Sequence, residues 1–171
     1  MNKQNVYVAF DGKNDIKEFA NFEEWEKTEN YPFHFINGME VALRLDKESD
    51  EVLKKKLGEL IDSCAIFVVL VTKTTKSFRR FVKWQVEYAI EKGMPIIVSN
   101  TNLIRSVDYD RCPMKLKKAL SLHIANNQEI VSYALLNWPA SHQDHLQNER
   151  IQTFRYEKEL YDFYHIKTSP F

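Results

Sequence analysis

The sequence of 171 residues predicts an α/β fold in which a parallel sheet is covered by helices on both faces. Short apolar runs alternate with segments whose apolar residues recur every three or four positions, the pattern of alternating strands and helices. One run, residues 65–71, has almost no polar member, which is typical of a strand buried on both faces of a parallel sheet. With five strands and the first one central, the expected order is flavodoxin-like, 2-1-3-4-5.

Residues 6–10 and 33–36 are the first two expected strands, because each is short, apolar and rich in β-branched or aromatic side chains. Between them, apolar residues at helical spacing follow a candidate N-cap, Asn14 or Asp15, whose side-chain oxygen can accept hydrogen bonds from free N–H groups. Residues 39–47 are mixed in character and are expected to form a loop.

Two amphipathic helices are expected on either side of the strand at residues 65–71. The first covers residues 48–63 and starts with acidic residues, which suit the positive end of the helix dipole. The second covers residues 76–92 and ends at Gly93, a residue type that favours a helix C-terminus. Its apolar stripe consists of Phe78, Val82, Val86, Ala89 and Ile90.

Further along the chain, residues 95–98 are expected to form another buried strand and residues 115–122 a helix. Residues 130–136 fit either a last strand or the edge of a helix, and residues 141–165 are expected to be a long, polar C-terminal helix. No repeat, linker or low-complexity segment interrupts the chain, so residues 1–171 are predicted to be a single domain.

Composition argues against several function classes. Lys and Arg together number 24, as do Asp and Glu, so there is no global basic excess with which to bind nucleic acid. The sequence shows no signal peptide and no apolar run of ~18–20 residues, which predicts a cytoplasmic protein without a membrane span. Cys64 and Cys112 provide no disulfide framework, and His142 and His145 lack the partners of a metal site.

A sheet of this topology binds ligands at the carboxyl ends of its strands, between the first and third strands. Residues 10–15 and residues 72–85 are expected to meet there. The first segment lacks the glycine spacing of a dinucleotide-binding turn or a P-loop. Asp11 and Asp15 can hold sugar hydroxyls instead, although a simple turn at Asp11 with Asp15 as a helix cap accounts for the same residues.

The helix at residues 76–92 carries one amide beside its apolar stripe. Gln85 lies with Phe81 on the flank of the stripe, where a hydrogen-bonding boundary residue is common. Trp84 is expected to pack against the core, and Glu87 is rotated away from Gln85 toward solvent. On the helical pattern alone, Gln85 is an ordinary boundary residue.

Six segments in the first hundred residues form a recognisable series: 6–11, 46–57, 61–72, 75–77, 80–86 and 89–98. In this order and spacing they resemble the TIR-like domain proteins of bacterial Thoeris antiphage systems. The resemblance extends over residues 5–100 and is less specific beyond them. It implies a flavodoxin-like, TIR-like fold for the chain.

The resemblance also implies an activity. Enzymes of this family cleave NAD+ at the bond between nicotinamide and ribose, and in Thoeris the product becomes a nucleotide signal that activates a separate effector protein. NAD+ would be the substrate, with no further cofactor; a homo-oligomer is compatible with the family, whereas nucleic acid and a membrane are not expected partners. The substrate would contact Phe10, Asp11, Asn14, Asp15, Phe81 and Trp84.

The family places its catalytic Glu on the helix after the third strand, at the position that Gln85 occupies here. A carboxylate there would stabilise the positive charge that develops on the ribose as nicotinamide leaves. Gln is nearly isosteric but uncharged, so substrate binding is expected to survive while turnover is impaired. Three explanations of Gln85 are open: a deliberate substitution that traps the ligand, a naturally inactive scaffold, or a loss of charge for which Glu87 compensates. The family pattern retained around position 85 favours the first.

The leading hypothesis is therefore an NAD+-cleaving enzyme of antiphage defence that is impaired at position 85. A TIR-like interaction module without catalysis is the first alternative, and it would act through assembly. An unrelated flavodoxin-like domain is the second, and it would bind a flavin or another nucleotide without cleaving NAD+.

Overall fold

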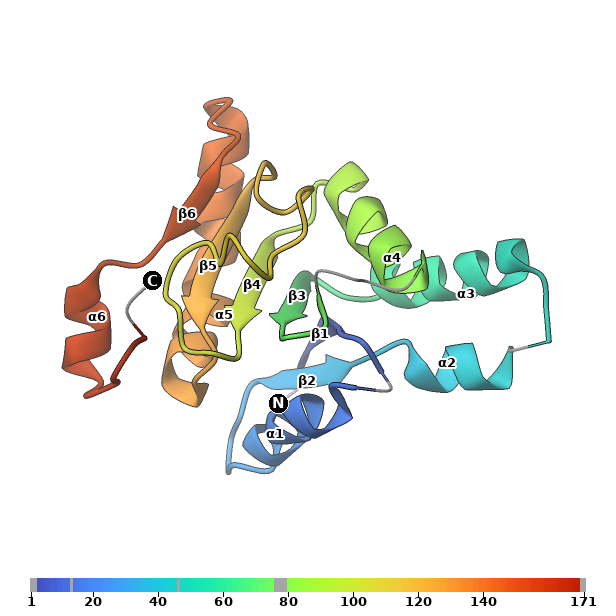
Figure 1. Ribbon diagram of the computed structural model, residues 1–171, viewed down its shortest axis with the longest axis horizontal. Coiled ribbons are helices and arrows are strands. Elements are labelled where there is room, and N and C mark those ends of the chain that lie inside the picture. The colour runs from blue at the N-terminus through green and yellow to red at the C-terminus, as the bar shows by residue number, and fades with distance from the viewer. Residues whose placement is uncertain (1–2, 13, 46, 76–79, 170–171) are drawn as a thin grey trace.

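The computed structural model describes residues 3–12, 14–45, 47–75 and 80–169. In these residues the chain forms one parallel sheet of six strands, in the order β2-β1-β3-β4-β5-β6 (Figure 1). The strands are β1 (Gln4–Ala9), β2 (Phe33–Ile36), β3 (Ile66–Val71), β4 (Ile96–Asn100), β5 (Ser121–Ala125) and β6 (Thr153–Arg155). The helices are α1 (Ile16–Glu26), α2 (Met39–Arg44), α3 (Asp50–Asp62), α4 (Arg80–Glu91), α5 (Gln128–Gln147) and α6 (Lys158–Phe163).

The predicted strand order 2-1-3-4-5 is confirmed, and a sixth strand extends the sheet at its outer edge. This strand, β6, pairs with β5 in parallel, with Thr153 opposite Ser121. It has three residues. So short a segment carries no measurable alternation of polar and apolar side chains, which is why its sequence does not reveal it.

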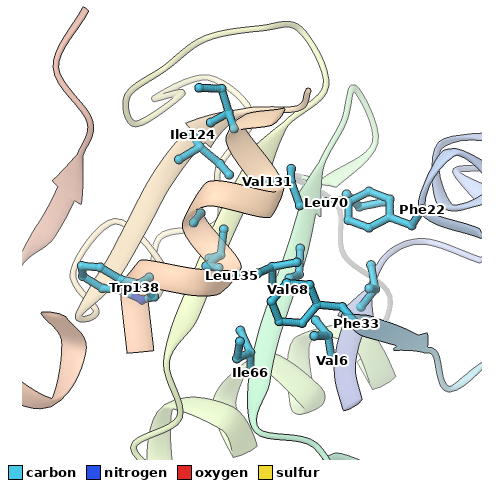
Figure 2. Packing of buried hydrophobic residues seen from close by; sticks show 14 of the residues in the cluster. Val6, Phe22, Phe33, Ile66, Val68, Leu70, Ile124, Val131, Leu135 and Trp138 are labelled. Carbon is cyan, nitrogen blue, oxygen red and sulfur yellow. The ribbon is translucent and has the colours of Figure 1, made fainter. Parts of the chain in front are cut away.

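The central strand β3 is buried along its whole length, as its apolar sequence predicts. Helices cover both of its faces. On one face Val131 and Leu135 of α5 point toward Val68 and Leu70 (Figure 2), in a core that also includes Phe19 and Phe22 of α1.

The opposite face of the sheet is covered by α3 and α4. Val82, Val86 and Ala89 of α4, three members of the predicted apolar stripe, are buried there together with Ile61 of α3. Residues 76–79, at the predicted start of this helix and including Phe78 of the stripe, lie outside the described residues.

Two predictions of local structure are wrong. Residues 39–47 are not a continuous loop, because α2 occupies Met39–Arg44 and begins where the Asn37 side chain accepts a 2.9 Å hydrogen bond from the Met39 N–H. Residues 115–122 do not form a helix, because residues 114–118 are turns and β5 begins at Ser121. All of β5 is buried between β4 and β6, so strand pairing outweighs the helical spacing of its apolar residues.

A long helix near the C-terminus is confirmed, but it begins and ends earlier than residues 141–165. It is α5, which takes in residues 130–136 and so resolves their ambiguity in favour of a helix. The Asn127 side chain caps it by accepting from the N–H groups of Glu129 and Ile130. After Gln147 the chain turns through Glu149, whose φ of 55° is left-handed, and enters β6. None of the helices in the described residues is both long enough and apolar enough to cross a membrane.

Candidate functional site

The side chain at position 85 lies at the buried interface between α4 and β1. The Tyr7 hydroxyl donates a 3.0 Å hydrogen bond to Oε1 of Gln85. Tyr7 is fully buried and Gln85 is only 8% exposed, so Gln85 lies deeper than a position on the flank of the stripe predicts. Burial raises the pKa of the Tyr7 phenol, which keeps the hydroxyl protonated and therefore a donor.

A glycine after β2 makes room for this pair. A Cβ atom on Gly38 would lie 2.5 Å from Oη of Tyr7 and 2.6 Å from Cδ2 of Leu57, both impossible contacts. Tyr7 and Leu57 are fully buried, so neither side chain has space to withdraw. The same Cβ would lie 3.6 Å from Nε2 of Gln85. The backbone at Gly38 is therefore one wall of the space around the Gln85 amide.

A second polar cluster joins the carboxyl ends of β1 and β3. Oγ1 of Thr72 donates to Oδ2 of Asp15 over 2.9 Å, and Oγ1 of Thr74 donates to the same oxygen over 3.2 Å. The N–H of Thr72 in turn donates to Oγ1 of Thr75 over 2.6 Å, which fixes the turn after β3. The expected meeting of residues 10–15 with the segment that starts at residue 72 is thus confirmed.

The Asp15 carboxylate has an unusual environment for a charged group. Its residue is 5% exposed. This burial raises the pKa of Asp15, the nearby charge of Asp11 acts in the same direction, and the hydroxyls of Thr72 and Thr74 oppose both. Asp15 is therefore a carboxylate that two threonines hold in place at the switch point of the sheet.

The prediction that Asp15 or Asn14 caps α1 is wrong for both side chains. Asp15 occupies the N-cap position, but its side chain makes no capping hydrogen bond because the carboxylate is engaged by the turn after β3. Nδ2 of Asn14 instead donates to Oδ2 of Asp11 over 2.8 Å. Asp11 is buried and Asn14 is exposed, so solvent reaches Asn14 more readily than it reaches Asp11.

Two of the residues expected to contact a substrate belong to the packing of the core. The Phe10 ring stacks on Phe19 of α1, with centroids 4.9 Å apart, on the face of the sheet opposite to Gln85. The Trp84 ring packs on Tyr88 at 5.0 Å. It also faces α3, where a Cβ atom on Gly58 would lie 3.7 Å from it. Trp84 thus joins α3 to α4, as the packing interpretation predicts.

The remaining candidates on α4 divide between its two flanks. Phe81, one turn before Gln85, is half-buried. Glu87 is directed to the other flank, where its carboxylate lies 3.8 Å from Nζ of Lys115 and its side chain is 32% exposed. Glu87 and Gln85 therefore face different surroundings, as their spacing on the helix predicts.

The structure adds residues that the sequence does not single out. Tyr7 is one of several aromatic residues in apolar strands, and Gly38 reads as an ordinary Asn-Gly turn. The hydroxyl of Tyr7 in a run of aliphatic residues is a weak signal of a buried polar partner. That the partner is Gln85, 78 residues away, is a matter of tertiary contact.

Metal and thiol chemistry find no support in the part of the chain that the structure describes. That part contains no group of three or more His, Cys, Asp or Glu side chains placed to hold a metal ion. Cys64 and Cys112 are free and buried. Burial raises the pKa of both thiols, that of Cys112 to about 12, so neither is a ready nucleophile.

Comparison with known proteins adds a family. A solved structure described as a conserved protein from Enterococcus faecalis V583 has a TM-score of 0.49 and 15% identity to this chain, covering 92% of it and 93% of that protein. The family model described as "Thoeris protein ThsB, TIR-like domain" matches residues 7–105, a span that contains both polar clusters and α4. Because the match takes in more than half of the 171 residues, the chain belongs to the TIR-like domain family of Thoeris protein ThsB.

Proposed function

We propose that this chain is an NAD+-cleaving enzyme of the Thoeris TIR family whose turnover is impaired because position 85 carries an amide. The observation that carries the proposal is the setting of Gln85: buried, bonded to Tyr7 and bordered by Gly38. A Glu side chain has the same shape. Its Oε1 would keep the bond from Tyr7, and its second oxygen would replace Nε2.

The chemistry follows from what a carboxylate would do in that place. Cleavage of the bond between nicotinamide and ribose releases neutral nicotinamide and leaves positive charge on the ribose. A nearby buried carboxylate attracts that charge strongly, because little water screens it and no reorganisation is needed. Water or another nucleophile then attacks the ribose. With Gln85 the attraction of a full charge is missing, which corresponds to a loss of about 10²–10³ in rate.

Asp11, Asn14 and Asp15 would contact the substrate from the β1–α1 loop. Asp11 follows Tyr7 by four residues, about 13 Å along an extended chain, so the loop and position 85 are separated by a distance that a dinucleotide can span. Asn14 would be the first of the three to meet the substrate because it is exposed. The product would be a nucleotide signal that activates a separate effector protein.

The test is to compare the protein with its Gln85→Glu variant, with NAD+ in excess, and to follow loss of NAD+ and release of nicotinamide. The variant is expected to turn over about 10²–10³ times faster than the protein with Gln85. Glu87→Gln, made in the Gln85→Glu background, is the matched control and is expected to leave the rate unchanged. If the Gln85→Glu variant is as inert as the parent, the enzymatic function is rejected.

Glu87→Gln made in the parent protein, with Gln85 retained, distinguishes compensation by Glu87 from a complete lack of catalysis. If Glu87 compensates for the missing charge, the parent protein is active and Glu87→Gln abolishes that activity. If the chain is a non-catalytic interaction module, Gln85→Glu changes neither NAD+ nor nicotinamide. Glu87 lies beside Lys115 on the other flank of α4, which argues against its taking part in chemistry at position 85.

A further inference from the structure

A large cavity lies at the amino ends of β4 and β5, at the other end of the sheet from Asp15 and Thr72. Its volume is about 920 Å³, which is within the range of small-molecule sites. One flank of α4, the segment before β5 and the last turns of α5 form its walls. It does not include Gln85, which faces Tyr7 instead.

The cavity exists because the connection from β4 to β5 lacks a covering helix. In a doubly wound sheet a helix normally follows each strand and packs on the sheet. Here residues 114–118 form turns, and residues 101–120, all of which the structure describes, contain no helix. A hollow is left between α4 and α5 beneath the first residues of β4 and β5.

The walls of the cavity are aliphatic. Val86 and Ile90 come from α4, Met94 precedes β4, Leu120 precedes β5 and Leu146 comes from α5. Among the described residues that line the cavity, His142 supplies the one aromatic ring. A flat heterocycle such as adenine would therefore find little to stack on, whereas a flexible hydrocarbon chain would be in contact with saturated carbon and sulfur on several sides.

The charged groups around the cavity are mostly positive. Lys83, Lys115 and Lys118 line it together with a single acid, Glu87, whose carboxylate lies 3.8 Å from Nζ of Lys115. Lys83 and Lys118 are exposed and form no ion pair with any described residue. Two ammonium groups at the edge of an aliphatic hollow thus have no carboxylate partner among the residues that the structure describes.

A buried imidazole in the wall of the cavity also favours a ligand that carries a polar group. His142 is 3% exposed, and its ring meets that of Trp138 with centroids 5.9 Å apart. An imidazole that lines a cavity can donate a hydrogen bond to a polar group of a ligand or accept one from it.

We propose that this cavity binds an amphipathic anion, with an aliphatic body against Val86, Ile90 and Leu146 and an acidic head near Lys83 and Lys118. A fatty carboxylate has this chemistry. The proposal is independent of NAD+ cleavage, because Gln85 does not line the cavity and its side chain is bonded to Tyr7 instead.

The probe for the test is dodecanoate, used below its micelle concentration with protein labelled with ¹³C at the methionine methyl groups. Met94 and Met114 line the cavity, whereas Met39 lies beside Gly12 at the other end of the sheet and serves as an internal reference. Saturable shifts of the Met94 and Met114 signals, without a shift of Met39, are expected. Dodecanol, which has the same chain but no charge, is expected to bind more weakly.

Two double variants are compared: one reverses two charges at the cavity, and the control reverses two charges elsewhere on the surface. Lys83→Glu with Lys118→Glu is expected to weaken dodecanoate binding about tenfold, since two exposed attractions become repulsions. Lys17→Glu with Lys55→Glu makes the same change on α1 and α3, away from the cavity, and is expected to leave binding unchanged. Both pairs are exposed, so folding should be retained.

Three results would overturn the proposal. The first is the absence of saturable shifts at Met94 and Met114. The second is equal binding of dodecanol and dodecanoate, or equal loss in the two double variants, which would remove the role of the lysines. The third is a concentration-dependent dimer whose formation shifts the Met94 and Met114 signals and which dodecanoate does not dissociate. The cavity would then be an interface between two copies of the chain.

Discussion

Removal of one hydroxyl group measures how firmly position 85 is held. Tyr7→Phe keeps the ring, which stacks on Phe67 with centroids 5.3 Å apart, and deletes the 3.0 Å hydrogen bond to Oε1 of Gln85. The Gln85 carbonyl is then left in a site that is only 8% exposed. An acceptor stranded in such a site costs about 1–3 kcal/mol, whereas the change in packing is small. The free energy of unfolding should therefore fall by about 1–3 kcal/mol.

Urea unfolding followed by circular dichroism measures this change, and a double-mutant cycle attributes it to the pair. In a Gln85→Met background the acceptor is gone, so Tyr7→Phe should be neutral within about 0.5 kcal/mol or slightly stabilising. Tyr109→Phe is the control, because Tyr109 is 74% exposed and should tolerate the same deletion. If Tyr7→Phe costs as much with Met at position 85 as with Gln, the hydrogen bond does not hold the side chain and the reasoning is refuted.

Three further outcomes are expected. Gly38→Ala should lower the free energy of unfolding by about 1–3 kcal/mol, because its Cβ would overlap Tyr7 and Leu57; an unchanged urea midpoint would contradict this. Burial raises the pKa of Asp15 above its ordinary 3.8, so the folded state holds that proton more tightly and stability should fall as pH rises above that value. Asp15→Asn should remove this slope, which unfolding curves at several pH values would reveal. Burial lowers the pKa of His123 from 6.5 to about 4, so in this range the unfolded state binds the proton more tightly than the folded state. The free energy of unfolding should therefore increase by roughly 3 kcal/mol as the pH rises from about 4 to 6.5. His123→Asn should remove this increase, and its persistence in the variant would show that His123 is not its source.

The candidate site was predictable in its location but not in the role of each side chain. The switch-point rule places residues 10–15 against the segment after β3, and the bond between Asp15 and Thr72 confirms that meeting. The rule does not say what each side chain does there. A helix cap is a reasonable role for Asp15 from its neighbours alone, but the threonines after β3 outcompete the free N–H groups of α1.

Misplaced elements have a similar cause. Residues 115–122 and 141–165 carry apolar residues at spacings that a helix can use, yet the first becomes turns and β5, and the second is divided among α5, β6 and α6. Strand pairing decides both cases, because β5 pairs with β4 along one edge and with β6 along the other. Such a gain is invisible in the local pattern.

Local patterns were sufficient for the class of fold, the positions of its first four strands and the apolar stripe of α4. Each of these depends on burying contiguous apolar surface, which period-2, period-3.6 and unbroken apolar runs record directly in the chain. The partner of Gln85, the need for glycine at position 38 and the cavity between α4 and α5 emerged only with the tertiary structure. They arise where residues far apart in the chain come within a few ångströms, and packing at that scale leaves no periodic trace in the sequence.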